Sequence, residues 1–348
     1  MTPGDLLGAV ILAALVAYAL LAGADFGGGV WDLLASGPRK VEQRRLVEHA
    51  IGPIWEANHV WLILVVVVLF TGFPRAFAAV STTLFLPLVL LLVGIVLRGA
   101  AFTFRAYDDH GDRVQARWGL VFSASSTLAP LLLGLVVGAL ASGRLRVDAD
   151  GVPIAGQLAA FSTFSAATGL FACALFAFLA ATYLAVEAAG ALAEDFRRRA
   201  LAAGVVVFVT ATVSLALSRS EAPLVFAGLT ARRWSLLLHV TTGASAIAAF
   251  GALLARRLRL ARAAAVAQVT LIVVGWGASQ YPYLVVPDVT LAAAGGPRAT
   301  QVALLVALAA GAVFLFPSLY LLFRVFKGER PFSVVDRRPA RRGGAAPR

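Results

Sequence analysis

Residues 6–34 read LLGAVILAALVAYALLAGADFGGGVWDLL, an apolar run in which Asp25 and Asp32 are the only charged side chains. A bilayer core of about 30 Å is crossed by roughly 20 apolar residues in a helix, so this run predicts a transmembrane helix. Eight further apolar runs of similar or shorter length follow it. The nine expected spans are residues 6–34, 51–70, 76–104, 119–141, 161–188, 201–217, 234–254, 263–281 and 302–326.

The composition of the whole chain agrees with this interpretation. Of its 348 residues, 60% are hydrophobic and only 14% are charged, with a mean hydropathy of +0.86. Soluble domains contain about 25% charged residues, so these figures exclude a soluble globular protein, a disordered chain and a disulfide-rich secreted scaffold. We therefore expect an all-α polytopic membrane protein with a single integral-membrane domain over residues 1–326. Basic residues are not interleaved with aromatic ones outside the spans, which argues against nucleic acid as a partner.

Lysine and arginine residues alternate between the two sides of the expected spans. Counting the last turn of the final span with its tail, 22 lie on one side and seven on the other, while Arg98 lies within the third span. Cytoplasmic loops carry the excess of basic residues, so the pattern places the N-terminus outside and the C-terminus in the cytoplasm. Residues 327–348 are expected to form a basic, disordered cytoplasmic tail near anionic lipid headgroups.

Asp25 is the most deeply placed acid of the first span, about 14 Å from its cytoplasmic end at 1.5 Å per residue. Gly27, Gly28 and Gly29 follow it and have no side chains, so another helix can approach the backbone closely there or water can enter. An ionisable side chain within a membrane is costly and is a candidate functional residue. Asp25 is either a hydrogen-bonded carboxyl beside a packing notch or a carboxylate that carries protons.

The start of the second span contains a second group of polar and aromatic residues. Glu56 and His59 are three residues apart on the expected helix and can touch, and Trp55, Asn58 and Trp61 lie around them. One interpretation is a belt of aromatic and wetted polar groups at the headgroups. The other, which we favour, is a proton route in which Glu56 and Asp25 occupy the cytoplasmic halves of consecutive antiparallel helices.

The remaining ionisable residues of the spans lead to simpler expectations. Arg98 is expected to extend to the cytoplasmic interface or to pair with Asp25 or Glu56. Asp32 and Glu187 lie near span ends and are expected to be solvated, and His239 is expected to be a hydrogen-bonded helix contact and not a ligand. No Cys/His cluster has metal-ligand spacing, and no second axial ligand is evident, so we expect this chain alone to bind neither metal nor haem.

Two segments resemble subunit II of cytochrome bd-type quinol oxidases, closest to the cyanide-insensitive branch. They are ADFGGGVWDL at residues 24–33 and IGPIWEANHVWL at residues 51–62. Shorter supporting segments are LRG at 97–99, ATYL at 181–184 and GWG at 275–277. The resemblance extends over nearly all of the expected spans and implies two four-helix bundles plus one peripheral helix.

The resemblance implies a terminal oxidase of the bacterial cytoplasmic membrane that oxidises quinol and reduces dioxygen to water. In that family, haem b with haem d, or b-type haem alone, belongs to subunit I, which would be the partner of this chain. Asp25 and Glu56 match acids implicated in proton delivery, whereas Ala22 replaces an aspartate of many relatives. A small accessory subunit and a structural lipid or quinone remain open. The alternatives are a proton-coupled transporter, which would be expected to show inverted repeats, and a purely structural scaffold.

Overall fold

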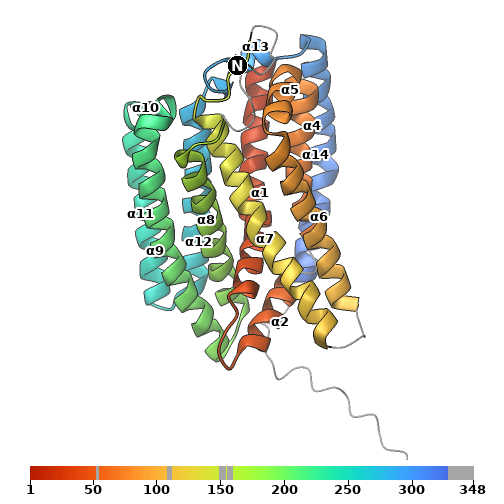
Figure 1. Ribbon diagram of the computed structural model, residues 1–348, viewed down its shortest axis with the longest axis vertical. Coiled ribbons are helices and arrows are strands. Elements are labelled where there is room, and N and C mark those ends of the chain that lie inside the picture. The colour runs from red at the N-terminus through yellow and green to blue at the C-terminus, as the bar shows by residue number, and fades with distance from the viewer. Residues whose placement is uncertain (52–54, 108–111, 149–153, 155–159, 328–348) are drawn as a thin grey trace, which may run out of the picture.

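The computed structural model describes residues 1–51, 55–107, 112–148, 154 and 160–327 (Figure 1). Within these residues, nine helical stretches are long and apolar enough to span a membrane. The stretches are α1 (Pro3–Leu33), the pair α3 (Trp55–Asn58) and α4 (Val60–Gly72), α6 (Phe85–Tyr107), α7 (Asp112–Ala141), α8 (Thr163–Glu187), α9 (Gly190–Glu221), α11 (Ser235–Leu254), α12 (Leu258–Gln280) and α14 (Arg298–Lys327). The expected all-α, nine-span architecture is confirmed. Residues 328–348, which make up nearly all of the expected tail, lie outside the described residues.

The structure corrects three of the expected spans. The second begins after a separate helix, α2 (Lys40–Ile51), and is divided at His59 into α3 and α4. The third expected span contains two helices, since α5 (Pro74–Thr83) ends before α6 begins. The helix is interrupted because Pro87 has no N–H to donate to the carbonyl group four residues earlier. The sixth is longer than its apolar run, since α9 includes the charged turn around Glu194.

The helices form two groups of four with one helix at the side. The first bundle contains α1, α3–α4, α6 and α7, and the second contains α8, α9, α11 and α12. Contacts of α8 with α1 and α7 join the bundles, and α14 packs against α1 and α4 (Figure 1). Two four-helix bundles plus one peripheral helix were expected, and the structure confirms this arrangement. The side chains in the central part of α14 are not buried by the chain.

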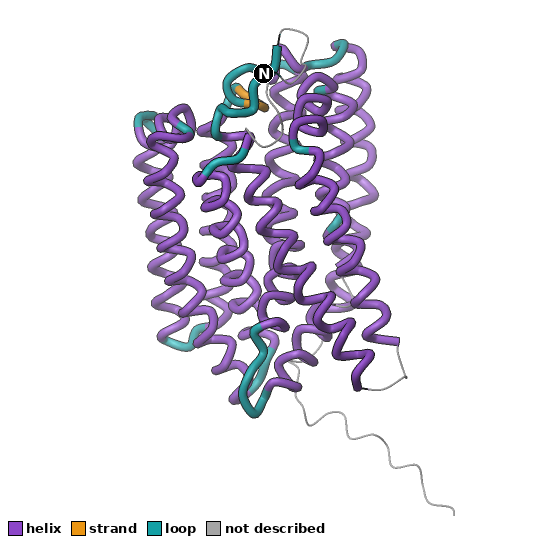
Figure 2. The backbone as a smooth tube through the Cα atoms, in the orientation of Figure 1, coloured by secondary structure: helices purple, strands orange, loops and turns teal. Residues whose placement is uncertain are grey.

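Short elements close the bundle at the end where α1 begins. They are α5, α10 (Pro223–Thr230), α13 (Leu291–Ala294) and the antiparallel strands β1 (Tyr283–Val285) and β2 (Val289–Thr290). Figure 2 shows that these strands are confined to this end, and that most of the remaining described backbone is helical, with loops joining the helices at both ends. The opposite end carries α2 and the charged first turns of α9; we call it the basic end.

The three consecutive glycines of α1 let three other helices approach its backbone. A Cβ atom on Gly27 would overlap the carbonyl group of Phe176 on α8, and one on Gly29 would overlap Ser126 on α7. A Cβ atom on Gly28 would meet the end of the Ile51 side chain on α2. The packing notch expected from the sequence is therefore present, and it holds α1 at the junction of the two bundles.

Candidate proton-transfer site

Tyr18, Asp25 and Asp32 form a polar stripe along α1. They are seven residues apart, and seven residues make nearly two full helical turns, so the three side chains lie on one face. All three are buried, with exposed fractions of 3%, 5% and 0% respectively. The stripe runs from the middle of α1 to its basic end and points into the first bundle.

Asp25 is held by side chains from two neighbouring helices. The Asn58 Nδ2 atom of α3 donates a hydrogen bond of 2.6 Å to Asp25 Oδ2. Arg98 of α6 interacts electrostatically with Asp25 and is only 1% exposed. Of the two expectations for Arg98, pairing with Asp25 is supported, and extension to the interface is wrong because the guanidinium is enclosed by the bundle.

The buried Arg98 guanidinium is stabilised by a hydrogen bond and by aromatic rings. Its Nε donates to Ser126 Oγ on α7 at 3.1 Å. Its Cζ lies 4.9 Å from the ring centroid of Phe26, with the rings of Phe122 and Trp55 at 5.6 and 6.0 Å. A cation over an aromatic face is attracted by the ring quadrupole, so these rings partly compensate for lost hydration. Arg98 is thereby fixed beside Asp25.

His59 lies at the break between α3 and α4 and faces the same interior. Its ring centroid is 6.0 Å from that of Tyr18, 5.9 Å from Phe26 and 6.0 Å from Trp55. Trp55 also packs on Gly99 of α6, so its ring lies between α3 and α6. The structure therefore brings Asp25, Asn58, His59, Trp55 and Arg98 together.

Glu56 and Trp61 lie apart from this group. Glu56 is exposed on α3, and the hydrogen bond that reaches Asp25 comes from the neighbouring Asn58. The Trp61 ring lies between α4 and α14, with its centroid 6.4 Å from that of Phe316. Glu56 is thus an acidic side chain on the outer surface of a membrane-spanning stretch.

The sequence reasoning missed the role of Asp32, which was expected to be solvated. It is fully buried, and its carboxylate accepts hydrogen bonds from Arg105 Nη1 at 3.0 Å and Ser123 Oγ at 2.6 Å. Arg44 of α2 lies 3.8 Å from the same carboxylate. The seven-residue spacing from Asp25 could have revealed it, because Asp32 had to share the inward face of α1.

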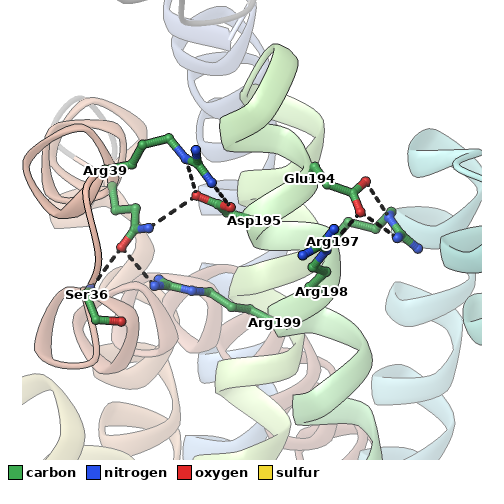
Figure 3. Close-up of polar contacts among 8 residues, drawn as sticks. Ser36, Arg39, Glu194, Asp195, Arg197, Arg198 and Arg199 are labelled. Atoms are coloured by element: carbon green, nitrogen blue, oxygen red, sulfur yellow. Dashed lines mark hydrogen bonds and ion pairs between the residues drawn. The ribbon is translucent and has the colours of Figure 1, made fainter.

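A second polar cluster joins α2 to α9 at the basic end (Figure 3). Arg39 donates two hydrogen bonds to Asp195, and Arg199 donates to the Gln43 side-chain oxygen at 2.8 Å. On the other face of α9, Glu194 accepts from Arg197 and Arg198 and lies 3.7 Å from Arg256. These contacts hold the loop before α2, and α2 itself, against α9 of the second bundle.

The second bundle has a partly open apolar cavity of about 960 Å³ between α8, α9, α11 and α12. His239 and Trp276 line it, and His239 Nδ1 lies 2.8 Å from the Ser235 carbonyl oxygen one turn earlier on α11. The lining contains no lysine or arginine to pair with haem propionates, so these residues do not fit haem. Among the described residues, no group of three His, Cys, Asp or Glu side chains is arranged to hold a metal ion.

The fold and the buried ionisable stripe define a multi-pass membrane protein whose α1 carries a carboxyl suited to proton transfer. Residues 5–326 match the family described as cytochrome bd terminal oxidase subunit II, and the chain belongs to this family. The match supports the quinol-oxidase interpretation over the transporter. Cytochromes are haem proteins, so an oxidase of this family contains haem and a subunit besides this one.

Individual relatives agree with the family. The chain is 25% identical over 327 residues to the putative cytochrome bd menaquinol oxidase subunit II of Bacillus subtilis, covering 90% of this chain and 93% of that one. It is 34% identical over 146 residues to the cytochrome bd ubiquinol oxidase subunit 2 of the same organism, but this match spans only 42% of each chain. The solved bd oxidase of Geobacillus thermodenitrificans shares the fold, with a TM-score of 0.78, 24% identity, and coverage of 95% of this chain and 100% of that one.

Proposed function

We propose that this chain is the non-haem subunit of a quinol-oxidising terminal oxidase and that Asp25 transfers protons from the cytoplasm toward the site of dioxygen reduction. Haem in the partner, subunit I, would supply the reduction of dioxygen to water. The observation that carries the proposal is the buried Asp25 carboxyl, which Asn58 and Arg98 hold in place. A carboxyl fixed by a donor and a nearby cation is positioned to accept and release a proton without moving.

The exposed position of Glu56 supports a partner on this side of the first bundle. A charged side chain that faces lipid costs several kcal/mol, so such residues nearly always face protein or water. Glu56 is exposed on α3, at the edge of α4. We therefore place subunit I against the surface around Glu56, where this carboxyl would pass protons between the subunits, with His59 as a further candidate.

The direction of proton uptake depends on the orientation of the chain. The excess of lysine and arginine at the basic end supports a cytoplasmic location for it in the bacterial cell membrane. Cysteine labelling tests this orientation. The native cysteine is removed by Cys173→Ala, and a single new cysteine is introduced by Gly37→Cys at the basic end or by Asp148→Cys at the opposite end. In intact cells, a membrane-impermeant maleimide should label only the Asp148→Cys variant, and labelling of Gly37→Cys would reverse the orientation.

The central test compares Asp25→Asn and Glu56→Gln with Asp148→Asn, which changes an exposed acid at the opposite end. The intact oxidase is purified for each variant, and quinol-dependent oxygen uptake is measured with haem content. Asp25→Asn should slow oxygen uptake by about 100-fold at unchanged haem content, because a positioned proton carrier is lost. Normal turnover in both site variants would favour the purely structural scaffold, and loss of haem together with activity would make the acids structural.

The cavity in the second bundle supports a structural role for a lipid or quinone tail. Its lining is almost entirely apolar, and a volume of about 960 Å³ is within the range of small-molecule sites. Mass spectrometry of organic extracts from the purified oxidase would detect such a molecule. Filling the cavity with Gly243→Phe should reduce its recovery.

A further inference from the structure

Five buried side-chain atoms around Asp25 have no hydrogen-bond partner among the described residues. They are Tyr18 Oη, Asn58 Oδ1, His59 Nδ1, His59 Nε2 and Arg98 Nη2. Most buried polar atoms in folded proteins are hydrogen-bonded to protein or to ordered water, so a concentration of unpaired atoms at one place requires an explanation. In a membrane the requirement is stronger, because lipid provides no donors or acceptors.

These atoms belong to side chains that lie next to one another. The rings of Tyr18 and His59 have centroids 6.0 Å apart, and Asn58 precedes His59 directly. Arg98 interacts electrostatically with Tyr18, His59 and Asp25. The side chains that carry the unpaired atoms therefore border one region between α1, the α3–α4 break and α6.

The chemistry of the atoms selects the kind of molecule that can occupy this region. Arg98 Nη2 can only donate, Asn58 Oδ1 can only accept, and the Tyr18 hydroxyl and the His59 ring can do both. An apolar molecule would leave every one of them unpaired. An anion would lie close to the Asp25 carboxyl, and a metal cation would lie close to the Arg98 guanidinium. Water donates and accepts equally and needs two to four polar partners, which this region provides.

We propose that Tyr18, Asn58, His59 and Arg98 bind a cluster of internal water molecules beside Asp25, and that these waters carry protons between the Asp25 carboxyl and the Tyr18 hydroxyl. The proposal rests on the proton-transfer function of Asp25. In each transfer, a water molecule accepts one proton and releases another to the next hydrogen-bond partner, so that no group is oxidised or reduced. Tyr18 lies seven residues from Asp25 and thus about 10 Å nearer the opposite end, which extends the route to the middle of α1.

A high-resolution electron cryomicroscopy map of the intact oxidase tests the water cluster directly. We expect ordered water density within hydrogen-bond distance of Tyr18 Oη and the His59 ring. Density for a lipid or another organic molecule in this region would overturn the proposal, and so would side chains packed so closely that no water fits between them.

Two variants test whether the waters carry protons. Tyr18→Phe removes one hydroxyl, and His59→Leu removes both ring nitrogens; Tyr281→Phe is the matched control, since its hydroxyl lies at an exposed contact with Asp5. At unchanged haem content, the two site variants should lower oxygen uptake by about tenfold and increase the ratio of rates in H2O and D2O. The control should match the unsubstituted enzyme in both measurements.

The outcomes separate this proposal from the function on which it rests. If Asp25→Asn leaves turnover unchanged, the proton-transfer function fails together with the water route. If Asp25→Asn slows turnover while Tyr18→Phe and His59→Leu behave like Tyr281→Phe, the water route alone is overturned. If a site variant loses haem, the map of the unsubstituted oxidase decides the presence of the cluster.

Discussion

Replacing Gly27 by alanine should destabilise the protein, although alanine is the better helix former. A Cβ atom at this position would overlap the Phe176 carbonyl group and would lie 2.8 Å from the Ala180 Cβ atom of α8. Carbon atoms without a bond between them are at their optimal separation at about 3.5–4.0 Å. Since the nearest obstacle is backbone, a rotamer change cannot relieve the clash, and α1 and α8 have to move apart by about 1 Å.

The expected cost follows from two opposing effects. Overpacking of a filled interior typically costs about 1–3 kcal/mol, and the overlap with backbone places Gly27→Ala at the upper end of that range. Alanine has a better helix propensity than glycine, which stabilises the folded protein by about 0.5–1 kcal/mol. The net loss should be about 2 kcal/mol, and separation of the helices would also weaken the neighbouring contacts of Asp25.

Heat inactivation of the purified oxidase provides the assay, with haem content recorded at each temperature. The control is Gly251→Ala on α11, where nothing lies within 4 Å of an added Cβ atom. Gly27→Ala should lower the inactivation midpoint by several degrees, while Gly251→Ala should leave it unchanged or raise it slightly. Equal midpoints for the two variants would refute the conclusion that α1 and α8 are in backbone contact at Gly27.

Other contacts lead to predictions in the same assay. Asp32→Ala leaves the Arg105 guanidinium without its buried carboxylate and should lower the stability of the protein by about 3–5 kcal/mol. Asp32→Asn retains the shape of the side chain and should lower the stability by less. Equal midpoints for the two variants would mean that the ion pair contributes little. Ser162→Ala removes the side-chain oxygen that accepts from the Ser165 backbone at the start of α8 and should cost about 1 kcal/mol. An unchanged midpoint for this variant would show that the capping bond is replaced by water.

The transmembrane helices could be predicted because each is a long apolar run, and length and hydropathy suffice to find such runs. The breaks inside them were not predicted. The expected third span joined α5 to α6, although α5 is much the less apolar of the two and ends at Thr83, before Pro87. At the break, the His59 ring packs against Tyr18 and Phe26 of α1, and these contacts are not visible in the local sequence pattern.

The candidate site was predicted in part. Asp25 and the three glycines were identified because a charged side chain and consecutive residues without side chains are unusual within an apolar helix. For Arg98 the sequence left two expectations, extension to the interface or pairing with an acid, because the aromatic rings that enclose it come from three separate segments. Asp32 was taken for a helix-end residue because its partners, Arg105 and Ser123, are distant in sequence. Pairings of this kind depend on which helices become neighbours, and a single sequence does not specify that.

The central position of α1 has a consequence for biosynthesis. The ribosome completes this helix first, yet its contacts include α8, α12 and α14, which are made progressively later. Until Phe176 of α8 has entered the membrane, the groove at Gly27 is open, and the second bundle cannot form before α12 is complete at Gln280. Helices first insert separately and then associate, so the nascent chain holds two carboxyls, Asp25 and Asp32, in a helix that is not yet enclosed. Chains that terminate before α8 is complete would retain this exposed acidic face in the membrane.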